Sequence, residues 1–466
     1  MQAISIPRKQ KGFISSSTLL ILAFSTAFFP RLLDSAGFPS AINFVHFLFV
    51  PVASCWIILQ APNKSRAQLD TLKTMLGGLF FLFAVMVASA LFNQAGIINL
   101  VLSFLLWTEP FFFLLAFVWT PITEKNLARM KKWIVRFSLF NIGLALLQKV
   151  FLDVGILTTT RGTRLGLPQD NIQGVFYLSG GGHVVSACVS ASFGLYYLIY
   201  AKAAPLWFRI SVMIAVVMQN LFAETKQVTF VCLVAFILLV ITRVTDIRKF
   251  LQYAIIVALL TFALLWCVAN VPAFRGYNTW ADWELYGPNG EATILKFSGI
   301  GIILENYWSP LNWLIGLGPG HTISRLGGWM LERYSDLLTP LGATVSPVAS
   351  NVWGFVASHR LGPKSSMFSP LFGWAGLWGD FGFLGLGIYV SLGVVIWQRF
   401  CRDDFCKFLM LNLVLHGFIF TQLEEPGYML FVAVLMGLRW HEICYERLNR
   451  RRLDMARQLF AAADTV

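Results

Sequence analysis

Charged residues are scarce in this 466-residue chain. They make up 13% of the sequence, against about 25% in soluble globular domains, and the mean hydropathy is +0.68. The sequence also lacks the short alternating segments that build membrane β-barrels, and it has no short-period repeat or low-complexity linker. These absences exclude an ordinary soluble domain and favour one helical domain in a membrane.

Cysteines are absent from the connections that we expect on the outer side of that membrane. All seven lie in predicted spans or on the inner side: Cys55, Cys188, Cys232, Cys267, Cys401, Cys406 and Cys444. A disulfide framework is therefore not expected. Cys401 and Cys406 flank two aspartates without a nearby histidine, which disfavours a zinc site. The sequence predicts neither a metal nor a cofactor.

Long apolar runs dominate the rest of the chain, and a run of about 20 such residues can cross a bilayer as a helix. Twelve runs fit, at residues 13–31, 41–60, 74–93, 96–120, 132–153, 183–201, 207–223, 227–243, 250–270, 376–398, 406–422 and 426–442. The predicted fold class is an all-α polytopic membrane protein with about twelve transmembrane helices. A large outer, periplasmic loop of short interfacial helices separates spans 9 and 10.

The connections are alternately rich and poor in Lys and Arg, and cytoplasmic loops carry the excess. Basic clusters at 64–73, 125–132 and 399–407 then lie inside. Both termini are predicted in the cytoplasm. The net charge of +13 is attributed to these residues and to a basic tail against anionic headgroups. A nucleic-acid partner is not expected.

Four segments follow from this topology. Residues 1–271 form a membrane domain with spans 1 to 9, and 272–375 form the periplasmic loop. Residues 376–442 carry spans 10 to 12, and 443–466 form a basic cytoplasmic tail. Several tryptophans in the loop favour short helices at the membrane–water interface, and apolar spacing predicts an amphipathic helix over 294–306.

Two outer connections carry candidate functional residues. Arg161 and Arg164 stand in a turn-rich connection, where two guanidinium groups bind either a diphosphate or lipid phosphates. Glu224 and Lys226 lie in a very short turn between two apolar spans. Ionisable residues at membrane depth indicate function, and the alternative is a local pair between these two side chains.

The long loop carries further candidates. Arg275 lies near its start, a Gly-Leu-Gly-Pro-Gly element at 316–320 predicts a flexible elbow, and Arg325 follows. His321 and His359 are interpreted either as a general base, since imidazole titrates near neutral pH, or as structural.

Asp380 lies among glycines at the opening of the tenth span. Glycines at such spacing allow close helix approach. We expect the Asp380 carboxylate to pair with an arginine of the long loop.

Taken in order, these pieces resemble the O-antigen ligase and O-antigen polymerase superfamily (the Wzy-like proteins) over residues 130–440. The elements that carry the resemblance are Arg164-Leu-Gly166-Leu-Pro168-Gln-Asp170-Asn171, Thr225-Lys226, Arg275, Gly316-Leu-Gly318-Pro319-Gly320 and Asp380-Phe-Gly382-Phe-Leu-Gly385. The chain departs from the family pattern in two places. Lys226 stands for an arginine, and residues 370–372 stand where a His-Asn pair is common.

The resemblance implies a metal-independent glycosyltransferase with a polyprenyl diphosphate-linked saccharide as donor and a glycan or lipid as acceptor. It also implies a place in the inner (plasma) membrane of a bacterium with two membranes. It implies catalytic roles for Arg164 and Lys226, which would neutralise the leaving diphosphate. His359 or His321 would take the acceptor proton. The residues expected to bind substrate are Arg161, Asn171, Glu224, Arg275, Arg325 and Asp380.

The long loop has few basic groups and no His-Asn pair, which favours a polymerase of O-antigen or exopolysaccharide repeat units. The alternative is a ligase that transfers glycan to lipid A core or to protein. Membrane lipids and other polysaccharide assembly proteins are the remaining expected partners. Two functions of another class remain as alternatives, a polysaccharide or lipid permease and a scaffold of an export complex. A permease would show charge along its spans and two related halves.

Overall fold

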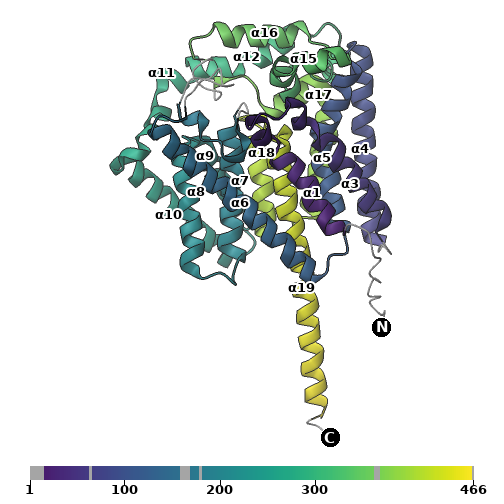
Figure 1. The fold of residues 1–466 in the computed structure, drawn as a ribbon, viewed down its shortest axis with the longest axis vertical. Coiled ribbons are helices and arrows are strands. Elements are labelled where there is room, and N and C mark those ends of the chain that lie inside the picture. The colour runs from purple at the N-terminus through teal and green to yellow at the C-terminus, as the bar shows by residue number, and fades with distance from the viewer. Residues whose placement is uncertain (1–14, 62–65, 158–167, 178–180, 362–367, 464–466) are drawn as a thin grey trace.

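The computed structural model describes residues 15–61, 66–157, 168–177, 181–361 and 368–463 (Figure 1). Within these residues the regular elements are helices and no strand occurs, so the all-helical class is confirmed. Each predicted span overlaps a helix. These helices are α1 (Ser16–Phe28), α3 (His46–Gln60), α4 (Arg66–Phe92), α5 (Ile97–Trp119), α6 (Glu124–Asp153), α7 (Gly182–Tyr200), α8 (Leu206–Phe222), α9 (Lys226–Ile241), α10 (Ile247–Asn270), α17 (Gly373–Arg399), α18 (Asp404–His416) and α19 (Pro426–Ala463).

Seven of the described helical segments are long and apolar enough to cross a membrane, rather than the twelve predicted. They are Ser40–Gln60, Gln68–Phe92, Ile97–Trp119, Glu124–Asp153, Gly182–Tyr200, Ile247–Asn270 and Gly373–Arg399. Helices α1, α8 and α9 are apolar but shorter. Helix α18 ends at His416 because the next residues turn back onto α17, where the N–H groups of Gly373 and Trp374 donate to the carbonyls of Phe420 and Gly417.

The elements of the predicted outer loop lie together at one end of the bundle, opposite the C-terminus (Figure 1). We call residues 272–358 the cap. Its helices are η4 (Pro272–Ala281), α11 (Trp283–Tyr286), α12 (Glu291–Glu305), α13 (Leu311–Ile315), η5 (Leu326–Met330), α14 (Leu331–Arg333), α15 (Ser335–Leu338), η6 (Thr339–Leu341) and α16 (Pro347–Ser358). Helix α12 matches the amphipathic helix predicted at 294–306.

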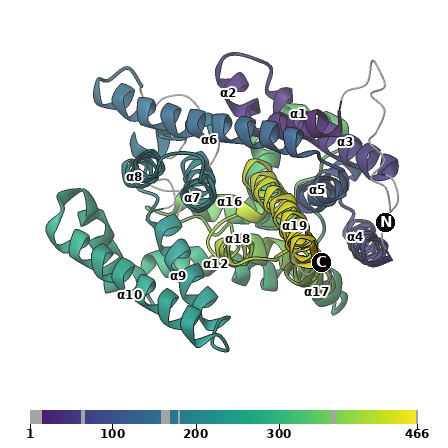
Figure 2. The ribbon, with the colours of Figure 1, turned by 90° about the horizontal axis from the view of Figure 1, so that it is seen from below.

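Four short helices precede the long ones at the same end of the bundle. They are α2 (Pro30–Ser35), η1 (Ser40–Phe44), η2 (Pro168–Asn171) and η3 (Gly174–Phe176), and a further turn, η9 (Gln422–Glu424), joins α18 to α19. The first half of α19 packs against α1, α5 and α7 (Figure 2). Phe431 of α19 stacks near Phe24 and Phe28 of α1, with ring centroids 6.1 and 6.2 Å apart. The core is therefore aromatic and lies along α19.

Helix α17 is kinked at Gly382, whose φ is 64°. A Cβ at this position would lie 2.3 Å from the backbone carbon of Leu314, so glycine is required both for the conformation and for the close approach of α13. The kink aims the first turns of α17 toward the cap.

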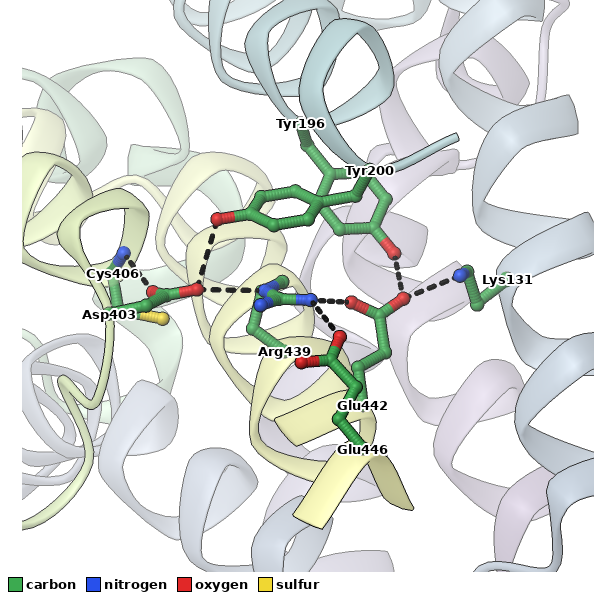
Figure 3. A network of polar contacts seen from close by, with 8 residues as sticks. All are labelled: Lys131, Tyr196, Tyr200, Asp403, Cys406, Arg439, Glu442 and Glu446. Atoms are coloured by element: carbon green, nitrogen blue, oxygen red, sulfur yellow. Dashed lines mark hydrogen bonds and ion pairs between the residues drawn. The ribbon is translucent and has the colours of Figure 1, made fainter. Parts of the chain in front are cut away.

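At the end opposite the cap, α19 is fixed by a polar network around Arg439 (Figure 3). The Arg439 Nε donates to Asp403 at 2.9 Å, and its Nη1 pairs with Glu442. Tyr200 donates to the same Asp403 oxygen at 3.0 Å, and Tyr196 donates to Glu442 at 2.8 Å. Beyond the network α19 continues as one helix to Ala463 and projects from the body (Figure 1), so the predicted tail at 443–466 begins as an extension of the last helix.

Candidate functional site

The glycine-rich element at 316–320 of the cap lies buried against α17. The Leu317 N–H donates to the Gly379 carbonyl at 2.8 Å, and the Asn99 amide donates to the Pro319 carbonyl at 3.1 Å. The element is therefore a packed turn rather than the flexible elbow predicted.

Asp380 supplies the central contact of this turn. Its carboxylate accepts from the N–H groups of Gly320 at 2.8 Å and Thr322 at 3.1 Å, and from the Thr322 hydroxyl at 2.6 Å. Among the described residues these groups and the Ser324 side chain, rather than an arginine, are its partners, which corrects the predicted ion pair. A carboxylate that binds several donors at a fully buried position organises the turn, so Asp380 is a positioning residue.

His321 is buried within the same turn. Its Nδ1 lies 3.1 Å from the Leu317 carbonyl and its Nε2 lies 2.9 Å from the Thr344 hydroxyl. Because a carbonyl only accepts, Nδ1 carries the proton and Nε2 accepts from the threonine. Both nitrogens are occupied, and burial lowers the pKa of the ring.

His359 lies at the end of α16 and is half-buried. Its Nδ1 accepts from the Leu361 N–H at 3.3 Å, which places the proton on Nε2, 3.5 Å from a Glu291 oxygen. Arg360 binds the same carboxylate. The ring is therefore part of a surface contact between α12 and α16.

Arg325 is buried where the cap meets the turn before α19. Its guanidinium pairs with Glu425 and its backbone N–H donates to Glu424 at 2.9 Å, while its Nε is buried with no hydrogen-bond partner among the described residues. The Trp329 ring lies 5.0 Å from this guanidinium and also 5.0 Å from that of Arg31. The predicted substrate-binding Arg325 is thus already held by an acidic and an aromatic partner.

A small pocket adjoins Arg325, with about 30 Å³ accessible to the centre of a water molecule. This volume fits one or two waters. His46 and Glu109 meet beside it, with the His46 Nδ1 2.9 Å from a Glu109 oxygen. Sequence inspection leaves these two residues scattered in separate spans, and the fold brings them together.

Lys226 begins α9 after the short turn predicted from the sequence. Its Nζ lies 3.9 Å from a Glu224 oxygen, and it packs against Gly276 of η4, where an added Cβ would lie 3.0 Å from Nζ. Glu224 has a φ of 49°, which is uncommon for a residue with a side chain. The Thr225 hydroxyl donates to the Asn220 side chain at 2.9 Å and fixes the turn.

The connection to α7 places Asp170 beside His183. The Asp170 Oδ1 lies 3.5 Å from the His183 Nε2, and both side chains are buried, at 9% and 6% exposed. The other two atoms of the pair, the Asp170 Oδ2 and the His183 Nδ1, are buried and have no hydrogen-bond partner within the part of the chain that the structure describes. Burial, followed by the charge of Glu224, raises the pKa of Asp170 to about 7. The neighbouring Asn171 donates to the Pro168 carbonyl at 3.2 Å.

Helix α6 holds this connection rigidly. The Gln148 side-chain oxygen accepts from the N–H groups of Gln173 and Gly174 at 2.8 and 2.7 Å. The Asn141 oxygen accepts from the Val175 N–H at 3.0 Å. The position of Asp170 is therefore set by side chains of a long helix rather than by a surface loop.

Lys296 of α12 is a cation that the sequence did not single out. Its ammonium donates to the carbonyls of Ser369 at 2.8 Å and Leu371 at 3.2 Å, and it lies 5.1 Å from the Phe420 ring. Burial lowers its pKa to about 7. The lysine was not predicted as a site residue because it lies within the regular apolar spacing of α12.

A long apolar groove opens below the cap, between α5, α17, α18 and α19. It encloses about 520 Å³ accessible to water-sized molecules. The residues that line its cap end include Trp374, Phe418 and Leu423, and Leu423 directly precedes the buried Glu424. The groove therefore ends beside the polar groups.

Three predicted residues are not placed. Arg161 and Arg164 lie outside the described residues, and Arg275 belongs to η4 with a side chain outside the described part. Asp170 and His183 were not predicted as site residues. Asp170 lies in a motif whose asparagine, Asn171, was taken as the functional residue, and His183 is the first residue of a predicted apolar span. A histidine directly after three glycines at that opening was the available signal.

A comparison with models of known protein families gave no match, and a comparison with curated proteins gave none. Within the described residues, no three His, Cys, Asp or Glu side chains are grouped to hold a metal ion.

Proposed function

We propose that this protein is a membrane glycosyltransferase that polymerises saccharide units carried on a polyprenyl diphosphate. In this proposal the twelve long helices cross the inner membrane of a bacterium. The cap faces the periplasm and both termini lie in the cytoplasm. The proposal combines the family resemblance with the polar groups gathered at the cap end of an otherwise apolar bundle.

The main observation in support of the proposal is the contact between the Lys226 side chain and η4. The amine lies against Gly276, directly after Arg275 in the chain. Departure of a lipid diphosphate from the anomeric carbon develops negative charge, and preorganised cations in a water-poor site stabilise it. Lys226 supplies one such cation from α9, and η4 brings the backbone of Arg275 next to it.

The apolar groove supports a lipid-linked substrate. A polyprenyl chain is a long hydrocarbon, and burying its surface is favourable by about 25 cal/mol per Å² relative to water. The groove ends next to Leu423 and Glu424, below the cap. A chain in the groove would therefore direct its diphosphate toward the polar end of the bundle.

The experiment is complementation of a chromosomal deletion with wild-type protein, with Lys226→Gln or with Lys249→Gln. Lys249 is an exposed lysine at the start of α10, paired with Asp246 at 3.1 Å, and serves as the matched control. Surface polysaccharide is resolved by length, lipid-linked intermediates are measured by mass spectrometry, and membrane levels of each variant are compared.

We expect Lys226→Gln to abolish long polymer and to accumulate single lipid-linked units, while Lys249→Gln matches wild type. Polymer that forms but fails to reach its acceptor would replace the polymerase with a ligase. Normal polymer from Lys226→Gln would reject the diphosphate site and favour a permease or a scaffold.

A further inference from the structure

We infer that His183, oriented by Asp170, is the base that takes the proton of the acceptor hydroxyl. The inference rests on the proposed function. The family resemblance gives the role of proton acceptor to His359 or His321, and this inference gives it to His183 instead. His183 opens α7, and Asp170 lies in η2 at the same end of the bundle.

The other histidines are engaged with protein groups. The chain has six histidines. His321 has a protein group within hydrogen-bonding distance of each ring nitrogen, and the His359 Nδ1 is occupied. The His416 Nδ1 lies 2.9 Å from the Asn412 carbonyl, and the His441 Nε2 lies 3.0 Å from the Phe117 carbonyl at the end opposite the cap. The sixth, His46, binds Glu109 through its Nδ1 at 2.9 Å.

Among the described residues, the His183 Nδ1 is the histidine nitrogen that is buried without a hydrogen-bond partner, while the His183 Nε2 faces Asp170. A proton on Nε2 points at the carboxylate and leaves the lone pair of Nδ1 free. This is the arrangement of a base oriented by a carboxylate. A buried polar atom without a partner calls for an explanation, and a catalytic role is one that suits an imidazole beside a carboxylate.

In the transfer step His183 accepts a proton and Asp170 stabilises the charge that His183 gains. The oxygen of the acceptor hydroxyl attacks the anomeric carbon, and the bond from that carbon to the diphosphate oxygen breaks. The bonding electrons leave with the lipid diphosphate, and the hydroxyl proton moves to the Nδ1 of His183. The Asp170 carboxylate stabilises the imidazolium, which later returns its proton to water.

Burial of both free atoms sets a requirement on the acceptor, which must displace the side chains that cover Nδ1. The charged and titratable groups at this end of the neighbouring elements include Lys149 and Asp153 of α6, Tyr177 after η3, His183 of α7, and Glu224 and Lys226 between α8 and α9. Among them Glu224 raises the pKa of Asp170, after burial, to about 7. Asp170 is therefore neutral below that pH and charged above it, so the rate should rise through about pH 7.

The test uses full-length protein in proteoliposomes, with lipid-linked saccharide extracted from the deletion strain as both donor and acceptor. Release of polyprenyl diphosphate is measured from acid to alkaline pH. A general base contributes roughly 10² to 10⁴ in rate, so His183→Gln should lose at least about a hundredfold in kcat with little change in KM. Asp170→Asn should flatten the rise through about pH 7. His441→Gln removes a buried histidine at the opposite end and should behave as wild type.

The results separate this inference from the proposed function. Failure of the wild-type protein to release diphosphate would reject both. A wild-type rate and pH profile in folded His183→Gln, or loss of rate in His359→Gln instead, would overturn the base assignment alone. If His183→Gln fails to fold, the pH profile of folded Asp170→Asn provides the test. An unchanged profile in that variant also overturns the assignment of His183 as the base.

Discussion

Replacement of Asp380 by alanine should destabilise the protein more than the loss of any surface charge. The carboxylate accepts three hydrogen bonds, from the N–H groups of Gly320 and Thr322 and from the Thr322 hydroxyl. Alanine leaves these buried donors unpaired, at about 1 to 3 kcal/mol each. The contributions overlap because the donors share one turn, so we expect a loss of roughly 3 to 6 kcal/mol in the free energy of unfolding.

The assay is thermal unfolding of the purified protein in detergent, followed by intrinsic fluorescence. One kcal/mol shifts the midpoint by about 2 to 4 °C in chains of 150 to 250 residues and by less in longer ones, so Asp380→Ala should lower it by roughly 4 to 8 °C. Asp336→Ala removes an exposed carboxylate from the same cap and should change the midpoint little. Equal midpoints for the two variants would refute the role of Asp380 as the organiser of the turn.

Three further predictions concern the helices. Gly382→Ala, at φ 64°, should lower the unfolding midpoint, whereas Gly387→Ala, whose Cβ meets nothing within 4 Å, should keep or raise it. Arg439→Ala removes the cation between Asp403 and Glu442, which keep Tyr200, Tyr196 and Lys131 as partners, and should cost about 1.5 to 3 kcal/mol, measured against Arg450→Ala in the exposed extension of α19. Gly393→Trp should fill the apolar groove, so that polyprenyl lipid no longer copurifies with the protein in native mass spectrometry. Gly387→Trp, on the exposed side of α17, should retain the lipid. Lipid that stays bound to Gly393→Trp would exclude the groove as the binding site of the polyprenyl chain.

The helices were predictable because hydrophobic runs are local features of a sequence. Each of the twelve predicted segments overlaps a helix, although seven of the described helical segments are long and apolar enough to cross a membrane, and α12 follows its apolar spacing. Helix ends were harder, since α18 stops where its following residues bind the first turn of α17. The continuation of α19 past residue 442 was also missed, because charged residues end a hydrophobic run without ending a helix.

The site was less predictable because its contacts join distant parts of the chain. Asp380 binds a turn 60 residues earlier, and no local pattern marks its partners. The element at 316–320 reads as flexible from its glycines, yet it is packed on several sides. His183 reads as the first residue of a span, and its pairing with Asp170 depends on how α6 holds η2 and η3.

The central claim is glycosyl transfer from a lipid diphosphate, and its most direct test is product analysis with the purified wild-type protein. Lipid-linked saccharide from the deletion strain is incubated with the protein in proteoliposomes, and both the saccharide length and the free polyprenyl diphosphate are quantified. The account predicts longer lipid-linked chains, with one polyprenyl diphosphate released for each unit added. Movement of intact lipid-linked saccharide across the bilayer, without lengthening or release, would contradict it.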